Sequence, residues 1–441
     1  MMRPGLLLSI LIAIATGAGV YLRGVYLYNS APAKVVPIGQ GQTEAPVPSE
    51  LTRTTADATE AVLLNQAFHV SSLRRLPFQQ DLAFVKADEA EIKRVWDRQV
   101  RSHYPSDSLA RFGLALQMLG LVSMELDLQA TYTSAPLIWE GAVYDGIRGQ
   151  MLYSEACNPA ESMAAKQQLA QQLMLMLLDQ RFAWRESQLL TEVNFDQAMA
   201  QKAFVMADAA WHMLRYTETD ANESILWAKA QAMGSALPPP FAEMELLPYR
   251  EGVHFCQEIT RANVSLDSMY QQMPTSTAQL LHPERFFRNP PYTPRTLRWF
   301  QLDLKGLEPA WDNVIGEALL RGWLRQHAPM DEADLMASSI DGDRMILYHS
   351  GKDGPQLLWK TAWRNVDRAQ AFVAFLVSRV SAIFGIEEVD TGEAGNHYYA
   401  GVLDLEISGR DEVVTLVRST TPEWRVALTN LAERSAFQKR P

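Results

Sequence analysis

The spacing of apolar residues divides the chain into a long helical stretch and a shorter stretch of strands. From 56 to about 330, apolar residues recur at the 3.6-residue period of an amphipathic helix. The clearest case is "QQLAQQLMLMLLDQRF" at 167–182, where a nearly continuous apolar run ends in a polar signature. Helical spacing and capping residues predict further helices within 88–100, 108–122, 194–216, 250–262 and 274–287, the last broken by Pro283.

Two kinds of strand pattern accompany these helices. The β-rich runs of "PLIWEGAVYDGIRGQMLYSEA" flank Asp145–Gly146, which predicts a hairpin. After about 331, two strands flank a Lys-Asp-Gly turn at 352–354, and an apolar helix follows and ends at Gly385. Two more strands and a last helix complete a ββαββα unit. The predicted fold is therefore α+β: a mainly helical body at 56–330, and at 331–441 an antiparallel sheet with helices on one face.

The N-terminus predicts export. No charged residue lies between Arg3 and Arg23, and a bilayer-spanning helix needs roughly 20 apolar residues. Tyrosines follow the run, as at a membrane interface, so we expect 1–28 to be an uncleaved anchor. Cleavage as a signal peptide, near Ala18 or after Ala33, is the alternative. Residues 29–55 are rich in Pro, Gly, Gln and Ser, which predicts a linker.

The net charge and the two cysteines argue against some classes of function. The net charge is −11 and no basic block is present, which argues against nucleic acid as a partner. The two cysteines, Cys157 and Cys256, match no zinc spacing and form no CxxC motif. In an exported body they either pair or remain as two buried thiols.

The helix at 167–182 has the frame of a zinc-peptidase helix without its ligands. Such a helix carries two histidines at i and i+4 on one face, with a glutamate between them as general base. The chain from about 71 to 375 resembles a family of exported gluzincin-type metallopeptidases, which carries a motif like "LAHELTHALQDQHF". Here "LAQQLMLMLLDQRF" aligns with that motif without gaps. Gln171 stands at the first histidine, Gln172 at the glutamate and Leu175 at the second histidine.

The third ligand is replaced as well. The family has "ALVEGDA" on the next helix, and this chain has "AFVMADA", with Met206 at the glutamate position. Further landmarks follow in family order, among them "GAVYDGIRGQMLY", "LPYREGVHF" and "PTSTAQLLHPERF". The resemblance implies a zincin-like body. Because amide, Leu and thioether side chains are poor zinc ligands, we expect no metal, no cofactor and no zinc-dependent hydrolysis.

Other residues offer chemistry for the same cleft. Asp208 and His212 stand at i and i+4 on the helix that should carry the third ligand, and a structural hydrogen bond is the expected reason. Glu251 and His254 form only half of a di-metal Glu-x-x-His pair. His282 either lines the groove or caps the helix that Pro283 breaks. Tyr249, in the same landmark as Glu251, is expected to shape the cleft.

These observations predict a membrane-tethered or secreted pseudo-metallopeptidase that binds a peptide or protein partner. One alternative is an active hydrolase that uses Asp208, His212, Glu251 or His282. The other is a purely structural envelope protein. An open polar cleft beside Gln171 and Met206 would favour binding, and a filled one would favour a scaffold.

Overall fold

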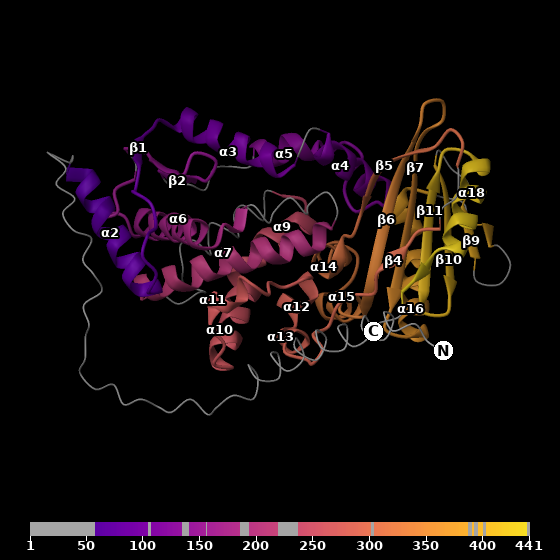
Figure 1. Ribbon diagram of the computed structural model, residues 1–441. Coiled ribbons are helices and arrows are strands. Elements are labelled where there is room, and N and C mark those ends of the chain that lie inside the picture. Colours follow the sequence, from indigo (N-terminus) through magenta and orange to yellow (C-terminus); the bar gives the residue numbers. More distant parts are fainter. Residues whose placement is uncertain are drawn as a thin grey trace, which may run out of the picture. The chain divides into compact units, whose positions relative to one another are not determined.

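The computed structural model describes residues 58–104, 107–134, 141–155, 157–185, 194–218, 237–300, 304–386, 390–391, 396–399 and 403–438 (Figure 1). The expected anchor at 1–28 and linker at 29–55 lie outside this part of the chain. None of the helices in the described ranges combines the length and apolar character that crossing a bilayer requires.

The N-terminal part combines helices with a small sheet. Its helices are α2 (Ala58–Arg74), α3 (Glu89–His103), α4 (Ser108–Met118) and α5 (Leu128–Ser134). The predicted hairpin is confirmed as β2 (Ala142–Asp145) and β3 (Gln150–Tyr153), and β1 (Phe84–Lys86) adds in parallel to give the order β1-β3-β2. The helix α4 begins at Ser108, and its cap residue Asp107 has a left-handed conformation.

Two long helices occupy the centre of this part. The helix α6 (Met163–Phe182) begins at the cap Ser162, whose side chain accepts the Ala165 N–H. The helix α7 (Phe195–Thr217) begins as predicted at the cap Asn194. The two helices pack against each other, and both contact α2 (Figure 1).

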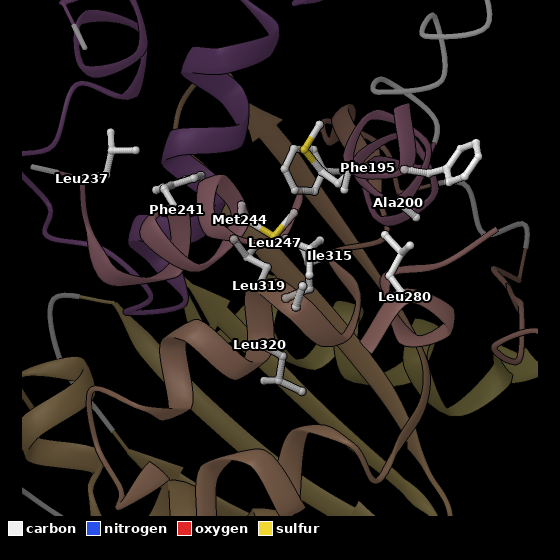
Figure 2. Close-up of a cluster of buried hydrophobic side chains, with 14 of the residues drawn as sticks. Phe195, Ala200, Leu237, Phe241, Met244, Leu247, Leu280, Ile315, Leu319 and Leu320 are labelled. Carbon is white, nitrogen blue, oxygen red and sulfur yellow. The ribbon is translucent and has the colours of Figure 1, made fainter. Parts of the chain in front are cut away.

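Shorter helices connect these to the sheet. They are α9 (Pro239–Leu246), α10 (Val253–Arg261), α11 (Leu266–Met269), α12 (Thr277–Leu281), α13 (Pro283–Phe286), α14 (Gly316–Leu324) and α15 (Met330–Ala337), with a π-helical turn, η2 (Pro248–Gly252), before α10. The predicted break at Pro283 is confirmed. Figure 2 shows apolar side chains of α7, α9, α12 and α14 converging in one cluster, with Phe195, Phe241, Leu280 and Leu319 among them.

The C-terminal part contains a seven-stranded antiparallel sheet in the order β5-β6-β7-β11-β10-β9-β8. Its strands are β5 (Glu308–Asn313), β6 (Ile340–Ser350), β7 (Gly354–Trp363), β8 (Asp390–Thr391), β9 (Asn396–Tyr399), β10 (Asp404–Arg410) and β11 (Val413–Ser419). The helices α16 (Val366–Ser378), α17 (Val380–Phe384) and α18 (Pro422–Arg434) accompany it, and β4 (Leu297–Arg298) pairs with β12 (Ala436–Phe437). The mixed α+β class is confirmed.

The expectation of helices on one face of this sheet is wrong. Along β7, Leu357 and Trp359 belong to the core that includes α16, whereas Leu358 belongs to a second core that includes α18. Because successive residues of a strand point to opposite faces, α16 and α18 cover opposite faces. The first core also contains residues of α6 and α7, and the described residues from Ala58 onward form one compact unit.

Candidate functional site

The four positions that replace the zinc ligands and the general base lie on the packed pair α6 and α7. Gln171 and Gln172 are each 2% exposed and Leu175 is 7% exposed, while Met206 is half-buried against the same core. These side chains are therefore part of the interior. Gln171 and Gln172 are thus buried side chains and do not lie on an exposed surface.

Gln171 contacts the π-helical turn η2. Its Nε2 donates to the Tyr249 hydroxyl at 3.1 Å, and burial raises the pKa of Tyr249 to about 12. The turn η2 packs closely on α7 at Gly252, which has no side chain. A Cβ added there would lie only 2.7 Å from the Ala207 Cβ. The hydrogen bond to Tyr249 thus connects α6 to η2. This turn contacts α7 at Ala207, which is the residue after Met206.

Gln172 and Gln168 form hydrogen bonds with backbone groups of β2, on the edge of that strand that does not pair with β3. The Gln172 Oε1 accepts the Tyr144 N–H at 3.0 Å, and the Gln168 Nε2 donates to the Ala142 carbonyl at 3.1 Å. The other edge of β2 pairs with β3. Unpaired strand edges inside a protein need such partners, so the glutamine at the general-base position has a structural role.

The polar signature at the end of α6 also makes structural contacts. The Tyr144 hydroxyl donates to Asp179 at 2.8 Å, and the Gln180 Oε1 accepts the Gln79 N–H at 2.9 Å. The Phe182 ring stacks on Tyr270, with centroids 3.9 Å apart and planes at 6°. The signature therefore ties the end of α6 to the hairpin, to the loop after α2 and to α11.

A buried polar cluster surrounds Asp208 on α7. Its carboxylate lies 2.8 Å from the His212 Nδ1 and 3.1 Å from the Arg74 Nη2, and it accepts the Tyr270 hydroxyl at 2.9 Å. Arg74 also lies 2.6 Å from Asp267. Burial raises the pKa of Asp208, but these hydrogen bonds and the arginine charge outweigh it and hold that pKa below its usual value. The expected structural contact between the two residues is present, since the His212 Nδ1 also hydrogen-bonds the Asp208 backbone carbonyl at 2.9 Å.

Glu251 and His282 belong to separate clusters. Glu251 lies 2.6 Å from the Arg250 Nε and 3.3 Å from the Arg321 Nη1. His282 ends α12 and its Nε2 lies 2.6 Å from the buried Glu317, which Arg285 holds at 2.7 Å. His282 thus occupies the capping position between two helices, and its ring binds a glutamate.

The donors of the described residues do not form a metal centre. No group of three or more His, Cys, Asp or Glu side chains in this part of the chain is arranged to hold an ion. Cys157 and Cys256 are both free and buried, so the alternative of a disulfide is not realised. Burial raises the pKa of the Cys256 thiol well above its usual value, which keeps the thiol protonated.

Three partners in these clusters had no sequence signal of their own. Arg74 and Tyr270 are 134 and 62 positions from Asp208, and Tyr144 is 28 positions from Gln172. Among the tyrosines, the sequence led us to expect only Tyr249 at the cleft, and it assigned no role to Tyr144. Only the fold shows which atoms meet.

Comparisons with known proteins give one family. A domain of unknown function (DUF8575) matches residues 307–427, which contain β5 to β11 and the beginning of α18. Comparisons with curated proteins and with solved structures found no match.

Proposed function

We propose that this chain is a catalytically inactive, metallopeptidase-like protein that acts by binding, outside the cytoplasm. The main observation behind the proposal is that the side chains of Gln171, Gln172 and Leu175 are buried. An amide that bonds Tyr249, an amide that satisfies a strand edge and a buried leucine leave no ligand set for zinc. Membrane tethering through 1–28, or secretion after cleavage, follows from the uncharged run between Arg3 and Arg23.

The hydrolase alternative has less support. Asp208, Glu251 and His282 each bind a different arginine or glutamate, in clusters on different elements. Nucleophilic catalysis requires a nucleophile and a base within hydrogen-bond reach of each other. None of these three clusters pairs a histidine with a serine or a cysteine at such a distance in the described part of the chain.

A structural envelope protein is the second candidate, and the burial of Gln171 favours it over peptide binding at that residue. A partner therefore needs another surface. A groove of about 490 Å³ between α15 and α16 offers one. Its lining includes the apolar residues Leu335, Met336 and Phe375 and the charged residues Arg368, Arg379 and Glu332. This chemistry suits a segment with an apolar face and acidic side chains.

Zinc analysis tests the central claim. The purified full chain should contain far less than one zinc per molecule by elemental analysis, and stoichiometric zinc would overturn the proposal. The variant Q171H/Q172E/L175H/M206E restores the ligands and the general base, and it tests whether α6 and α7 have the geometry of a zinc site. It should bind zinc at least a hundredfold more tightly than the matched variant Q171H/Q172E/L175H/M206Q, which lacks the third ligand.

A crosslinking experiment separates binding from a purely structural role. A photo-crosslinking residue at Leu335, which is 52% exposed, should capture a discrete partner in the exporting cell. The same residue at Val426, which is 50% exposed on α18, is the control. Equal and diffuse capture at both positions would favour the structural protein.

A further inference from the structure

A second site is suggested by a cavity of about 370 Å³ under the C-terminal end of α18. Polar residues from three adjacent strands line it. Lys360 on β7 pairs in register with Thr415 on β11, and Thr415 pairs with Ser408 on β10. No residue of α6 or α7 contributes to this lining, so the cavity is independent of the positions discussed above.

Lys360 is a buried lysine that forms no ion pair among the described residues, although Glu433 lines the same cavity. The residue is 7% exposed, and its Nζ donates to the Ala432 and Ser435 carbonyls, each at 2.6 Å. No carboxylate of the described residues forms an ion pair with it within 4.0 Å, and the charge of Glu433 acts only from further away. Two of the three ammonium hydrogens are thus used on neutral carbonyls. Buried charges in proteins are normally paired, so this arrangement is incomplete.

The lining also contains two arginines and a threonine hydroxyl, which differ in how many of their hydrogen bonds and charges are already satisfied. Arg295 is already bound to Asp341 at 2.9 Å and Glu412 at 3.0 Å, so its charge is balanced. Arg410 is exposed at the rim, beside Asp411. The Thr429 hydroxyl is buried and has no hydrogen-bond partner among the described residues.

Apolar groups form the rest of the wall. Ala432, Ala436, Val413 and Phe437 line the cavity together with the polar row. The volume lies at the lower end of the range of about 300–1,000 Å³ that is typical of small-molecule sites. A bare inorganic ion would leave most of this space unfilled, whereas a small molecule with an apolar body would occupy it.

We infer that this cavity binds a small organic anion, a carboxylate or a phosphate monoester with a compact apolar body, whose oxyanion pairs with Lys360. The third ammonium hydrogen and the hydroxyls of Ser408, Thr415 and Thr429 are the donors for the anionic oxygens. The apolar body lies against Phe437. Pairing with the buried Lys360 ammonium gives the anion its advantage over a neutral molecule of the same shape.

Calorimetric titration of the full chain tests this inference. Benzoate and phenyl phosphate are the probes, and benzamide is the neutral isostere of benzoate. At pH 7 at least one anion should bind at least tenfold more tightly than benzamide, and the tighter of the two identifies the anionic group. Lys360→Met should weaken that binding at least tenfold. Lys352→Met, at an exposed lysine, should leave it unchanged.

A second measurement on the unaltered protein covers the case in which Lys360→Met does not fold. Burial lowers the pKa of Lys360 to about 8, so anion affinity should fall as the pH rises through that value. Bound anion should also slow acetylation of Lys360 at least fivefold in mass-spectrometric mapping, without protecting Lys352. Equal affinity for benzamide, absence of binding at 10 mM of either anion, or unchanged acetylation would overturn the inference.

Discussion

Asp196 should make the protein less stable at alkaline pH, a direction opposite to that of most carboxylates. The residue lies at the start of α7 and is 2% exposed. Its Oδ1 accepts the Thr277 N–H at 3.1 Å and the Thr277 hydroxyl. Burial raises the pKa of Asp196 from 3.8 to about 7, and the negative charges of Asp343 and Glu317 add to the rise, against the hydrogen bonds from Thr277.

The sign and size of the effect follow from this pKa. The folded-state pKa lies above the unfolded value, so the contribution of Asp196 to stability is fully present below pH 3.8 and is lost as the pH rises through about 7. Each pKa unit is worth about 1.4 kcal/mol, so ionisation of Asp196 in the folded protein costs about 4 kcal/mol in total. Of this, about 2.5 kcal/mol is lost between pH 5 and pH 8.

The substitution Asp196→Asn removes the cost of ionising this side chain and little else, because asparagine keeps the acceptor oxygen for Thr277 and carries no charge. The assay is the free energy of unfolding of the full chain in urea, for both proteins at pH 5 and pH 8. Relative to the unaltered protein, the variant should gain about 2–3 kcal/mol between the two pH values. The exposed Asp331→Asn variant serves as control and should gain nothing. If the Asp196→Asn variant and the unaltered protein have the same pH dependence, the buried carboxyl does not titrate as described.

Three further predictions concern stability, each measured by urea unfolding. Asp208→Asn should cost about 1–3 kcal/mol at pH 7, because Arg74 loses one of its two carboxylate partners and keeps Asp267. The pKa of Asp208 is lowered, so this cost should shrink as the pH falls below 3.8. Gly316→Ala should cost more than about 2 kcal/mol, since φ is +74° and a Cβ would lie 1.9 Å from a carboxylate oxygen, whereas the open Gly351→Ala should stay within about 0.5 kcal/mol. Phe182→Leu should cost about 1 kcal/mol through the loss of its stacked ring.

Local patterns predicted the helices and turns of this fold well. The cap Asn194, the hairpin at Asp145–Gly146 and the break at Pro283 each depend on a few neighbouring residues. Gly385 ends α17 with a φ of +65°, as expected of a C-terminal glycine. Such signals act within one or two turns of the chain, and they remain valid whatever the tertiary structure is.

The arrangement of these elements depends on contacts that no local pattern contains. The covering of both faces of the sheet is one example, although β7 gives a hint, because Leu357, Leu358 and Trp359 are all apolar. A strand with one solvated face would alternate apolar and polar residues. The cluster around Asp208 is another example, since its arginine comes from α2 and its tyrosine follows α11.

The candidate site shows why a replaced motif is hard to interpret from the sequence. Gln171 and Gln172 are polar, and polar residues at ligand positions suggest that some chemistry remains. Their contacts argue otherwise, because one amide bonds a tyrosine hydroxyl and the other satisfies the N–H of an edge strand. A buried amide that lost such a partner would cost about 1–3 kcal/mol, so packing alone is sufficient to keep glutamine at both positions. The reversion variant therefore tests more than zinc affinity. Histidines at 171 and 175 and glutamate at 206 must bind the metal tightly enough to offset the contacts that the changes at 171 and 172 remove.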